Sequence, residues 1–232
     1  EIIDITMPVI TLSTIPRVKN PSDTISISAT ILVENEKITP AKFANFRASW
    51  SATMNGVAVD IASLLTTPTN QMDIALSNSA LLPSQTYQLF FSMYLSTAIG
   101  NFTSIASSPS MLVNIPPLPG VLQITPSSGK AFSTLFTIQC MQFTEDNLPM
   151  RYSFKYTNSD GIEVILSRFS SENKISDIML PAGFGTNNTL TITTSVSDSY
   201  GAITTISQTV SVVDVEPASL VKAETLVASV LS

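Results

Sequence analysis

The segment Leu81-Leu82-Pro83-Ser84-Gln85-Thr86-Tyr87 decides the fold of the first half of the chain, because it precedes a strictly alternating run. Leu89, Phe91 and Met93 follow Tyr87 at every second position, as in a strand with one buried face. A tyrosine that begins a strand after a proline-containing turn can return its hydroxyl to the backbone upstream. This arrangement, a tyrosine corner, is typical of β-sandwiches.

Similar runs recur every 8 to 12 residues along the chain, with turn residues between them, and predict an all-β protein. The first half has candidate strands at 5–15, 23–33, 44–54, 57–62, 71–78, 85–96 and 103–114. The second half has them at 120–125, 131–141, 150–157, 161–167, 174–180, 188–197 and 202–213. In the run 131–141, Phe132 alternates with Phe136 and Ile138 and is expected on the same buried face.

The stretch Ile115-Pro116-Pro117-Leu118-Pro119-Gly120 divides the two halves, since its prolines remove backbone donors and no strand can run through it. We therefore expect one sandwich over residues 1–115 and a second over 116–215. Residues 216–232 predict a short C-terminal helix, because Leu220, Val227 and Leu231 fall on one helical face after Pro217.

The composition excludes several classes of function. The chain has 232 residues, a net charge of −6, no histidine and one cysteine. The negative charge disfavours nucleic acid and anionic lipid, and the missing histidine removes the usual catalytic triads and zinc sites. We expect a protein that is not an enzyme, with no catalytic residue, cofactor or metal. The chain begins at Glu1 with no signal sequence, which indicates a fragment of a longer protein whose membrane anchor lies elsewhere.

Two side chains have both a functional and a structural interpretation. Trp50 could be an aromatic platform for a sugar, but it alternates with Phe46 and Ala48, which predicts a core position. Cys140 could be a reactive thiol, but it shares a predicted face with Ile138 and has no activating neighbour, which favours burial.

The segment Val196-Ser197-Asp198-Ser199-Tyr200-Gly201-Ala202 predicts a turn between the last two strands of the second half. Asp198 can accept backbone N–H bonds across the turn, and Gly201 can take the left-handed conformation that ends it. A calcium site is the alternative, built from Asp198 with Asp160, Asp146 or Glu145.

Motifs from both halves resemble known extracellular modules. The segment 81–87 is similar to fibronectin type III domains, and a longer series over roughly 20–214 resembles the REJ (receptor for egg jelly) module. The matching segments of the second half are 116–120, 124–140, 146–154, 180–183 and 196–202. The resemblance implies two tandem fibronectin type III/immunoglobulin-like sandwiches in the ectodomain of a polycystin-type or egg-jelly-receptor-type membrane protein.

The resemblance also implies a role and a location. It implies a non-catalytic structural and interaction module on the extracellular face of the cell surface or ciliary membrane. Its partners would be other domains or chains of a larger extracellular assembly, including a polycystin-type channel complex. The alternative is an adhesin or filament repeat that binds a glycan or protein through its loops.

Two further features agree with an extracellular module. Asn101-Phe102-Thr103 and Asn187-Asn188-Thr189 are N-glycosylation acceptor sequences, at Asn101 and Asn187. The stretches 190–196 and 202–213 carry almost no charge, so strands formed there need a cover at any open edge. We expect a neighbouring domain or chain to pack on an edge or face, unless these strands are internal to their sheets.

Overall fold

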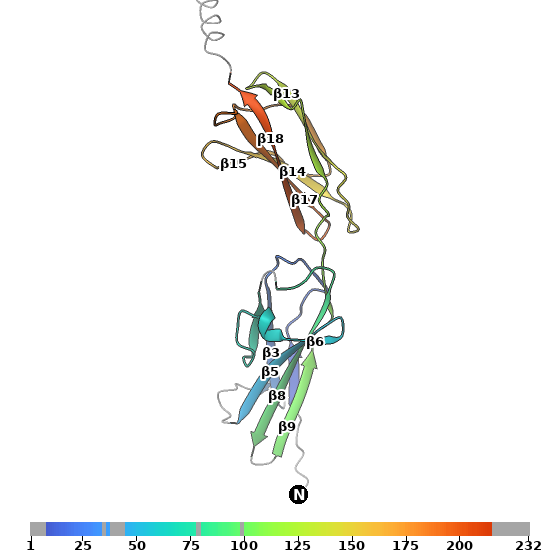
Figure 1. Ribbon diagram of the computed structural model, residues 1–232. Helices are drawn as coiled ribbons and strands as arrows, with labels where there is room; N and C mark the ends of the chain where they lie inside the picture. Colours follow the sequence, from blue (N-terminus) through green and yellow to red (C-terminus); the bar gives the residue numbers. More distant parts are fainter. Residues whose placement is uncertain (1–7, 34–35, 38–44, 78–79, 98–99, 215–232) are drawn as a thin grey trace, which may run out of the picture. The chain divides into compact units, whose positions relative to one another are not determined.

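The computed structural model describes residues 8–33, 36–37, 45–77, 80–97 and 100–214. The chain divides into two compact units, Glu1–Ile115 and Pro116–Ser232. Both are all-β sandwiches of two facing sheets, as the alternating sequence predicts (Figure 1). The predicted helix over 216–232 lies outside the described residues.

Unit 1 pairs its strands in two sheets, one of order β1-β3-β4 with β7 also on β3, and one of order β2-β10-β8-β5-β6 with β9 also on β8. The strands are β1 (Val9–Leu12), β2 (Val18–Lys19), β3 (Ile25–Val33), β4 (Glu36–Lys37), β5 (Phe46–Met54), β6 (Val57–Val59), β7 (Asp73–Leu76), β8 (Thr86–Thr97), β9 (Gly100–Ser107) and β10 (Met111–Val113). A 3₁₀ helix, η2 (Ile61–Leu64), follows β6.

Unit 2 has a sheet of order β11-β13-β16 and a second of order β12-β18-β17-β14-β15. The strands are β11 (Val121–Thr125), β12 (Ser128–Lys130), β13 (Leu135–Met141), β14 (Arg151–Thr157), β15 (Glu163–Ser170), β16 (Lys174–Met179), β17 (Thr189–Ser197) and β18 (Ile203–Val213). Most pairs are antiparallel, but β12 runs parallel to β18, and β2 runs parallel to β10 in unit 1.

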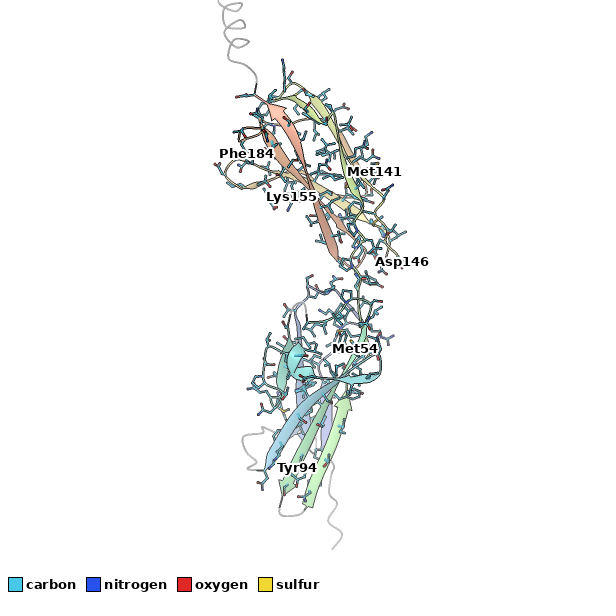
Figure 2. All side chains as sticks on the ribbon, viewed as in Figure 1. Met54, Tyr94, Met141, Asp146, Lys155 and Phe184 are labelled. Atoms are coloured by element: carbon cyan, nitrogen blue, oxygen red, sulfur yellow. The ribbon has the colours of Figure 1, made fainter. Side chains whose placement is uncertain are left out.

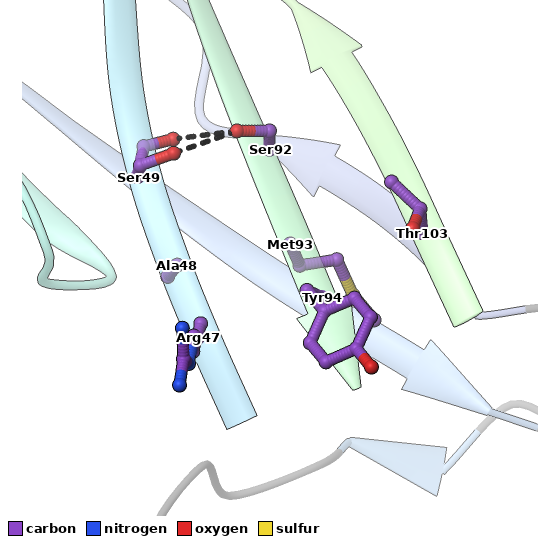
Figure 3. Close-up of a pocket in the computed structure, with 7 residues that line it drawn as sticks. All are labelled: Arg47, Ala48, Ser49, Ser92, Met93, Tyr94 and Thr103. Atoms are coloured by element: carbon purple, nitrogen blue, oxygen red, sulfur yellow. Dashed lines mark hydrogen bonds between the residues drawn. The ribbon is translucent and has the colours of Figure 1, made fainter. Parts of the chain in front are cut away.

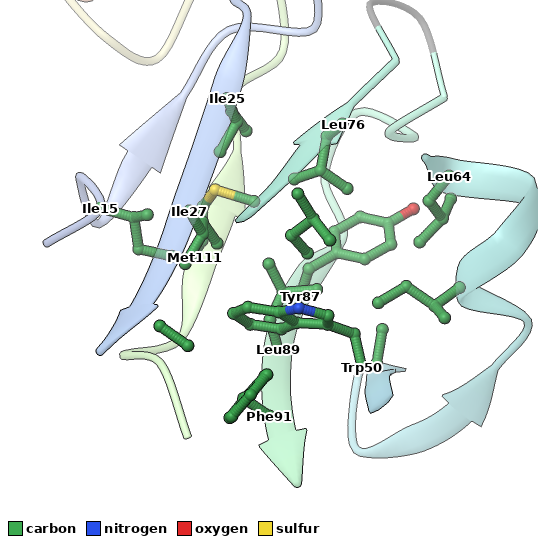
Figure 4. Close-up of a cluster of buried hydrophobic side chains, with 14 of the residues drawn as sticks. Ile15, Ile25, Ile27, Trp50, Leu64, Leu76, Tyr87, Leu89, Phe91 and Met111 are labelled. Atoms are coloured by element: carbon green, nitrogen blue, oxygen red, sulfur yellow. The ribbon is translucent and has the colours of Figure 1, made fainter. Parts of the chain in front are cut away.

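Each unit has its own core between its sheets. In unit 1, Trp50, Leu89 and Phe91 pack with Ile27 of the opposite sheet (Figure 4). In unit 2, the core includes Phe136, Phe154 and Leu190. The side chains that alternate with these core residues point outward, and Tyr94 does so near the end of β8 (Figure 2). Burial of alternate large apolar side chains therefore holds each pair of sheets together.

Tight turns join the central hairpins where the sequence has Asn-Gly and Asp-Gly. Asn55 and Gly56 connect β5 to β6 with φ values of 51° and 80°, the left-handed pair that a two-residue hairpin turn needs. Between β14 and β15, Gly161 has φ 77°, and Asn158 Oδ1 accepts hydrogen bonds from the backbone N–H groups of Asp160 and Ile162.

Three predicted strands differ from those observed. The run 103–114 is two strands, because Pro109 interrupts it and the Ser108 hydroxyl accepts the Leu89 backbone N–H at 3.1 Å. The run 57–62 ends at Val59, since Asp60 caps η2 through the Ala62 N–H. The run 131–141 starts only at Leu135, because 131–134 form a turn in which Phe132 has φ 50°.

Candidate interaction surfaces

Two kinds of feature are absent from the residues that the structure describes. They contain no group of three His, Cys, Asp or Glu side chains that could hold a metal ion. They also contain no helix long and apolar enough to cross a membrane.

Tyr87 and Trp50 lie in the core of unit 1. Tyr87 is 2% exposed, and its hydroxyl oxygen accepts the backbone N–H of Leu82 at 3.1 Å, so the segment forms a tyrosine corner. Trp50 is 3% exposed, donates its indole N–H to the Gln71 carbonyl at 2.8 Å and meets Phe91 edge-on with ring centroids 5.0 Å apart. Trp50 is thus a packing residue rather than a platform for a sugar.

Asp198 and Gly201 form the turn between β17 and β18. Asp198 is buried, and its Oδ1 accepts the backbone N–H groups of Tyr200 and Ala202, each at 2.9 Å. Gly201 has φ 84°, and its N–H donates to the Asp198 carbonyl. Oδ1 of Asp198 therefore holds the turn, and the described residues place no two further acidic groups beside Asp198 as a metal-binding cluster.

Cys140 is buried between the sheets of unit 2. Its Sγ lies 3.2 Å from the Thr194 hydroxyl oxygen. Burial raises the pKa of the Cys140 thiol, and the hydrogen bond with Thr194 opposes that rise in part. The thiol therefore stays protonated and serves as a small core side chain.

A pocket of about 360 Å³ lies on the outer face of β5, β8 and β9 in unit 1 (Figure 3). The Tyr94 ring lies between Arg47 and Thr103, which are on the neighbouring strands. The hydroxyls of Ser49 and Ser92 are 2.8 Å apart beside it. Arg47 has no ion-pair partner in the part of the chain that the structure describes, so its guanidinium faces this pocket uncompensated.

Both acceptor asparagines are exposed. Asn101 lies on β9, opposite Ser96 of β8, and its Thr103 lines the pocket beside Tyr94. Asn187 lies in a turn between Phe184 and Thr189. The sequence predicted turns at or near both sites, but not that each sequon threonine would pair with an aromatic residue.

Exposed apolar side chains gather at the end of unit 2 where β18 finishes. Leu135 and Met179 are a cross-strand pair, 50% and 53% exposed. Phe132 is 68% exposed, and its backbone N–H donates to the carbonyl of Leu180, next to Met179. Val213 is also exposed, and its carbonyl accepts the N–H of Ala131 at 2.8 Å.

We call these four residues the apolar cluster: Phe132, Leu135, Met179 and Val213. The expected position of Phe132 on the buried face is wrong, because the turn at 131–134 rotates this residue away from the alternation of β13. A strand pattern cannot reveal such a rotation.

The edges of the second sheet differ in how they are covered. β17 lies between β14 and β18, so the uncharged run 190–196 is internal. On one side of β18, β17 pairs with residues 203–211, and on the other side β12 pairs only with the last three residues, 211–213. Within the described chain, no strand pairs with the other side of 203–210.

The comparisons with known proteins decide the family. The REJ domain matches residues 6–232, nearly the whole chain. The chain belongs to the REJ domain family. The match confirms the resemblance seen in the sequence. Domains of this family are typically extracellular parts of larger proteins and serve as structural or interaction modules.

Several solved structures are also similar to this chain, at low sequence identity. The titin domains Z1Z2 in complex with telethonin are 14% identical over 92% of this chain and 100% of theirs, with a TM-score of 0.32. The FN1–FN3 domains of chicken CNTN1 are 16% identical over 85% and 69%, with a TM-score of 0.36. A 1.5-MDa bacterial ice-binding adhesin is 11% identical over 91% and 66%, with a TM-score of 0.40. No curated protein matches the chain.

Proposed function

We propose that this REJ chain is a non-catalytic module of the ectodomain of a large cell-surface or ciliary membrane receptor. It contacts a neighbouring sandwich domain of the same extracellular assembly through the apolar cluster of unit 2. A polycystin-type channel complex is the kind of assembly that the family suggests. The exposed cluster is the observation that carries this proposal.

The cluster differs from the other exposed apolar side chains because it combines a directly opposed pair with a third residue bonded beside that pair. Leu135 and Met179 face one another across the ladder, and Phe132 is tied to the same strand end. Full burial of a fully exposed large apolar side chain contributes about 1.5–3 kcal/mol, so covering one that is half exposed contributes about half of that. Covering three of them offsets part of the entropy cost of association.

The position of the cluster indicates what covers it. Val213 ends β18, so the cluster lies beside the last described residues of unit 2. A domain that follows unit 2 would be held at a high effective concentration against these side chains. An apolar patch on that domain is therefore the expected partner surface.

Site-specific photo-crosslinking tests the proposal in the full-length protein at the cell surface. A photoreactive residue at position 132 is expected to link to an adjacent domain of the same assembly. The matched control is position 165, because Ile165 is also exposed, at 59%, but lies on β15 away from the cluster. Equal crosslinking at both positions, or a protein absent from the cell surface, would overturn the proposal.

A second candidate function is the adhesin repeat that binds a glycan or protein ligand. The pocket around Arg47 and Tyr94 favours it, since an unpaired guanidinium beside an aromatic ring suits an acidic sugar. Crosslinks from position 132 to no neighbouring domain, together with saturable binding of a soluble saccharide, would support this candidate instead.

A further inference from the structure

We propose that Asn187 carries an N-linked glycan whose first sugar packs on the Phe184 ring, so that the turn is a built glycan site. The proposal rests on the extracellular location given above. Its test, however, measures contact between sugar and ring rather than assembly. The occupant is an N-acetylglucosamine attached to this chain.

Phe184, Asn187 and Thr189 are brought together by one tight hairpin. Phe184 and Thr189 exchange two backbone hydrogen bonds, Phe184 N to Thr189 O at 3.0 Å and Thr189 N to Phe184 O at 3.1 Å. Side chains of such a directly opposed pair lie on the same face. The aromatic residue and the sequon threonine are therefore neighbours, with Asn187 in the loop that joins them.

The turn holds this arrangement through its own backbone. Asn188 donates its N–H to the Gly185 carbonyl at 3.2 Å, and Gly185 and Asn188 take φ values of 73° and 49°. Both values lie in the left-handed region, which glycine and asparagine tolerate better than other residues. The sequence thus supplies the residues that this loop shape requires.

Contacts outside the turn fix it against the rest of unit 2. Val212 donates its N–H to the Asn188 carbonyl at 2.8 Å, and the Ser211 hydroxyl donates to the Asn187 carbonyl. A Cβ atom on Gly183 would lie 2.0 Å from the Asn188 carbonyl oxygen, so only glycine permits this close approach. The acceptor asparagine is therefore presented on a preorganised loop.

Phe184 is 40% exposed, so part of its ring is open to solvent and can be covered by a sugar. The less polar face of N-acetylglucosamine, with its ring C–H groups, suits an aromatic ring. The Thr189 hydroxyl can hydrogen-bond to the N-acetyl group on the same side. Tethering through Asn187 removes most of the association cost that a free sugar would carry.

The other sequon shows a similar juxtaposition. Thr103 lies directly opposite Tyr94 on the adjacent strand, and Asn101 is the next residue along that face. The two sequons lie in different units and in different local structures. The repeated pairing of a sequon threonine with an aromatic ring is the independent observation that supports a glycan at these positions.

The modification itself is an ordinary transfer of a saccharide. The donor is a lipid-linked pyrophosphoryl oligosaccharide, supplied with its transferase by the secretory pathway. The Asn187 amide nitrogen forms a bond to the anomeric carbon of the first sugar. The bond between that carbon and the pyrophosphate oxygen breaks, the amide loses one proton to a base on the transferase, and the lipid pyrophosphate leaves.

The test compares the whole chain, secreted from eukaryotic cells, with its Phe184→Ser and Phe184→Tyr variants. Occupancy of Asn187 is read by mass spectrometry, and trimming with an endoglycosidase leaves a single N-acetylglucosamine. Hydrogen exchange of β17 amides is then compared with that of the Asn187→Gln protein. With Phe184 or Tyr, the single sugar is expected to slow exchange by about threefold to tenfold.

With Phe184→Ser, the sugar is expected to have no effect on that exchange rate. Ile165→Ser is the matched control, because Ile165 is also an exposed apolar residue of unit 2 but lies on β15, outside both the turn and the apolar cluster. It should leave the effect of the sugar unchanged. An unoccupied Asn187, or equal slowing in the Phe184→Ser protein, would overturn the proposal and leave the proposed contact at the apolar cluster untouched.

Discussion

Removing the hydroxyl of Tyr87 tests how the first sandwich is closed. The Tyr87→Phe substitution keeps the buried ring and deletes only the oxygen that accepts the Leu82 backbone N–H at 3.1 Å. Because Tyr87 is almost fully buried, water cannot readily replace that oxygen. The change therefore isolates one hydrogen bond between the strand and the turn before it.

The expected cost has two parts. A typical hydrogen bond contributes about 1 kcal/mol to the free energy of unfolding, and a buried donor left without a partner costs about 1–3 kcal/mol. Since Leu82 itself is exposed, its N–H is only partly shielded, which points to the lower end of the range. We expect a loss of about 1–2 kcal/mol and a lower melting temperature by about 5–10 °C.

Trp50 provides a direct measurement, because it is the only tryptophan in the chain and lies in the same core as Tyr87. Urea unfolding followed by its fluorescence reports unit 1 alone. Tyr94→Phe is the control, since Tyr94 is on the same strand but its hydroxyl makes no hydrogen bond within the described chain. Equal midpoints for Tyr87→Phe and the control would refute the reasoning.

Two further predictions concern unit 2. Asp198→Ala is expected to lower the free energy of unfolding by about 2–4 kcal/mol, since two backbone N–H groups lose their acceptor, whereas Asp198→Asn keeps an oxygen and should cost less. Far-UV circular dichroism measures both, and equal losses would contradict the turn role. Burial raises the pKa of Cys140 above its ordinary value of 9.0. The folded state therefore keeps the thiol proton to a higher pH than the unfolded state does. The free energy of unfolding should keep its full value below pH 9.0 and fall as pH rises through the folded pKa. At pH 8 the folded thiol should react with an aromatic disulfide reagent about tenfold or more slowly than in denaturant, and comparable rates would contradict its burial.

Alternation and turn chemistry were enough to predict the two-sandwich architecture, because local residue types determine which strand faces are buried. The parallel pairing of β12 with β18 was not predictable in this way. It joins three-residue segments more than 80 positions apart, at Ser128 with Ser211 and Lys130 with Val213, and neither segment has a period of its own. Likewise, the buried Ser108 replaces a backbone partner of Leu89 with its hydroxyl, which no hydrophobic pattern reveals.

The candidate sites differ in the same way. Tyr87 and the Asp198 turn could be located from residue types, because their hydrogen bonds join residues within five positions of each other. Trp50 could be placed in the core from its alternation with Phe46 and Ala48, but its hydrogen bond to Gln71 could not be predicted in this way. The apolar cluster could not, since it depends on how the turn at Phe132 meets the end of β16. The pairing of Phe184 with Thr189 depends on left-handed conformations that sequence alone leaves open.

The parallel pairing between the second strand and the last strand of each unit has a mechanical consequence. In unit 1, β2 is bonded to β10, with Asn114 donating to the Lys19 carbonyl at 2.7 Å, and in unit 2, β12 is bonded to β18. Tension applied at the two ends of a unit would pull such parallel neighbours in opposite directions along their length. Their hydrogen bonds, which cross between the strands, would then be sheared together instead of opening one after another. In each sandwich, the parallel pairing of the second strand with the last strand is therefore a geometry that resists force applied along the chain.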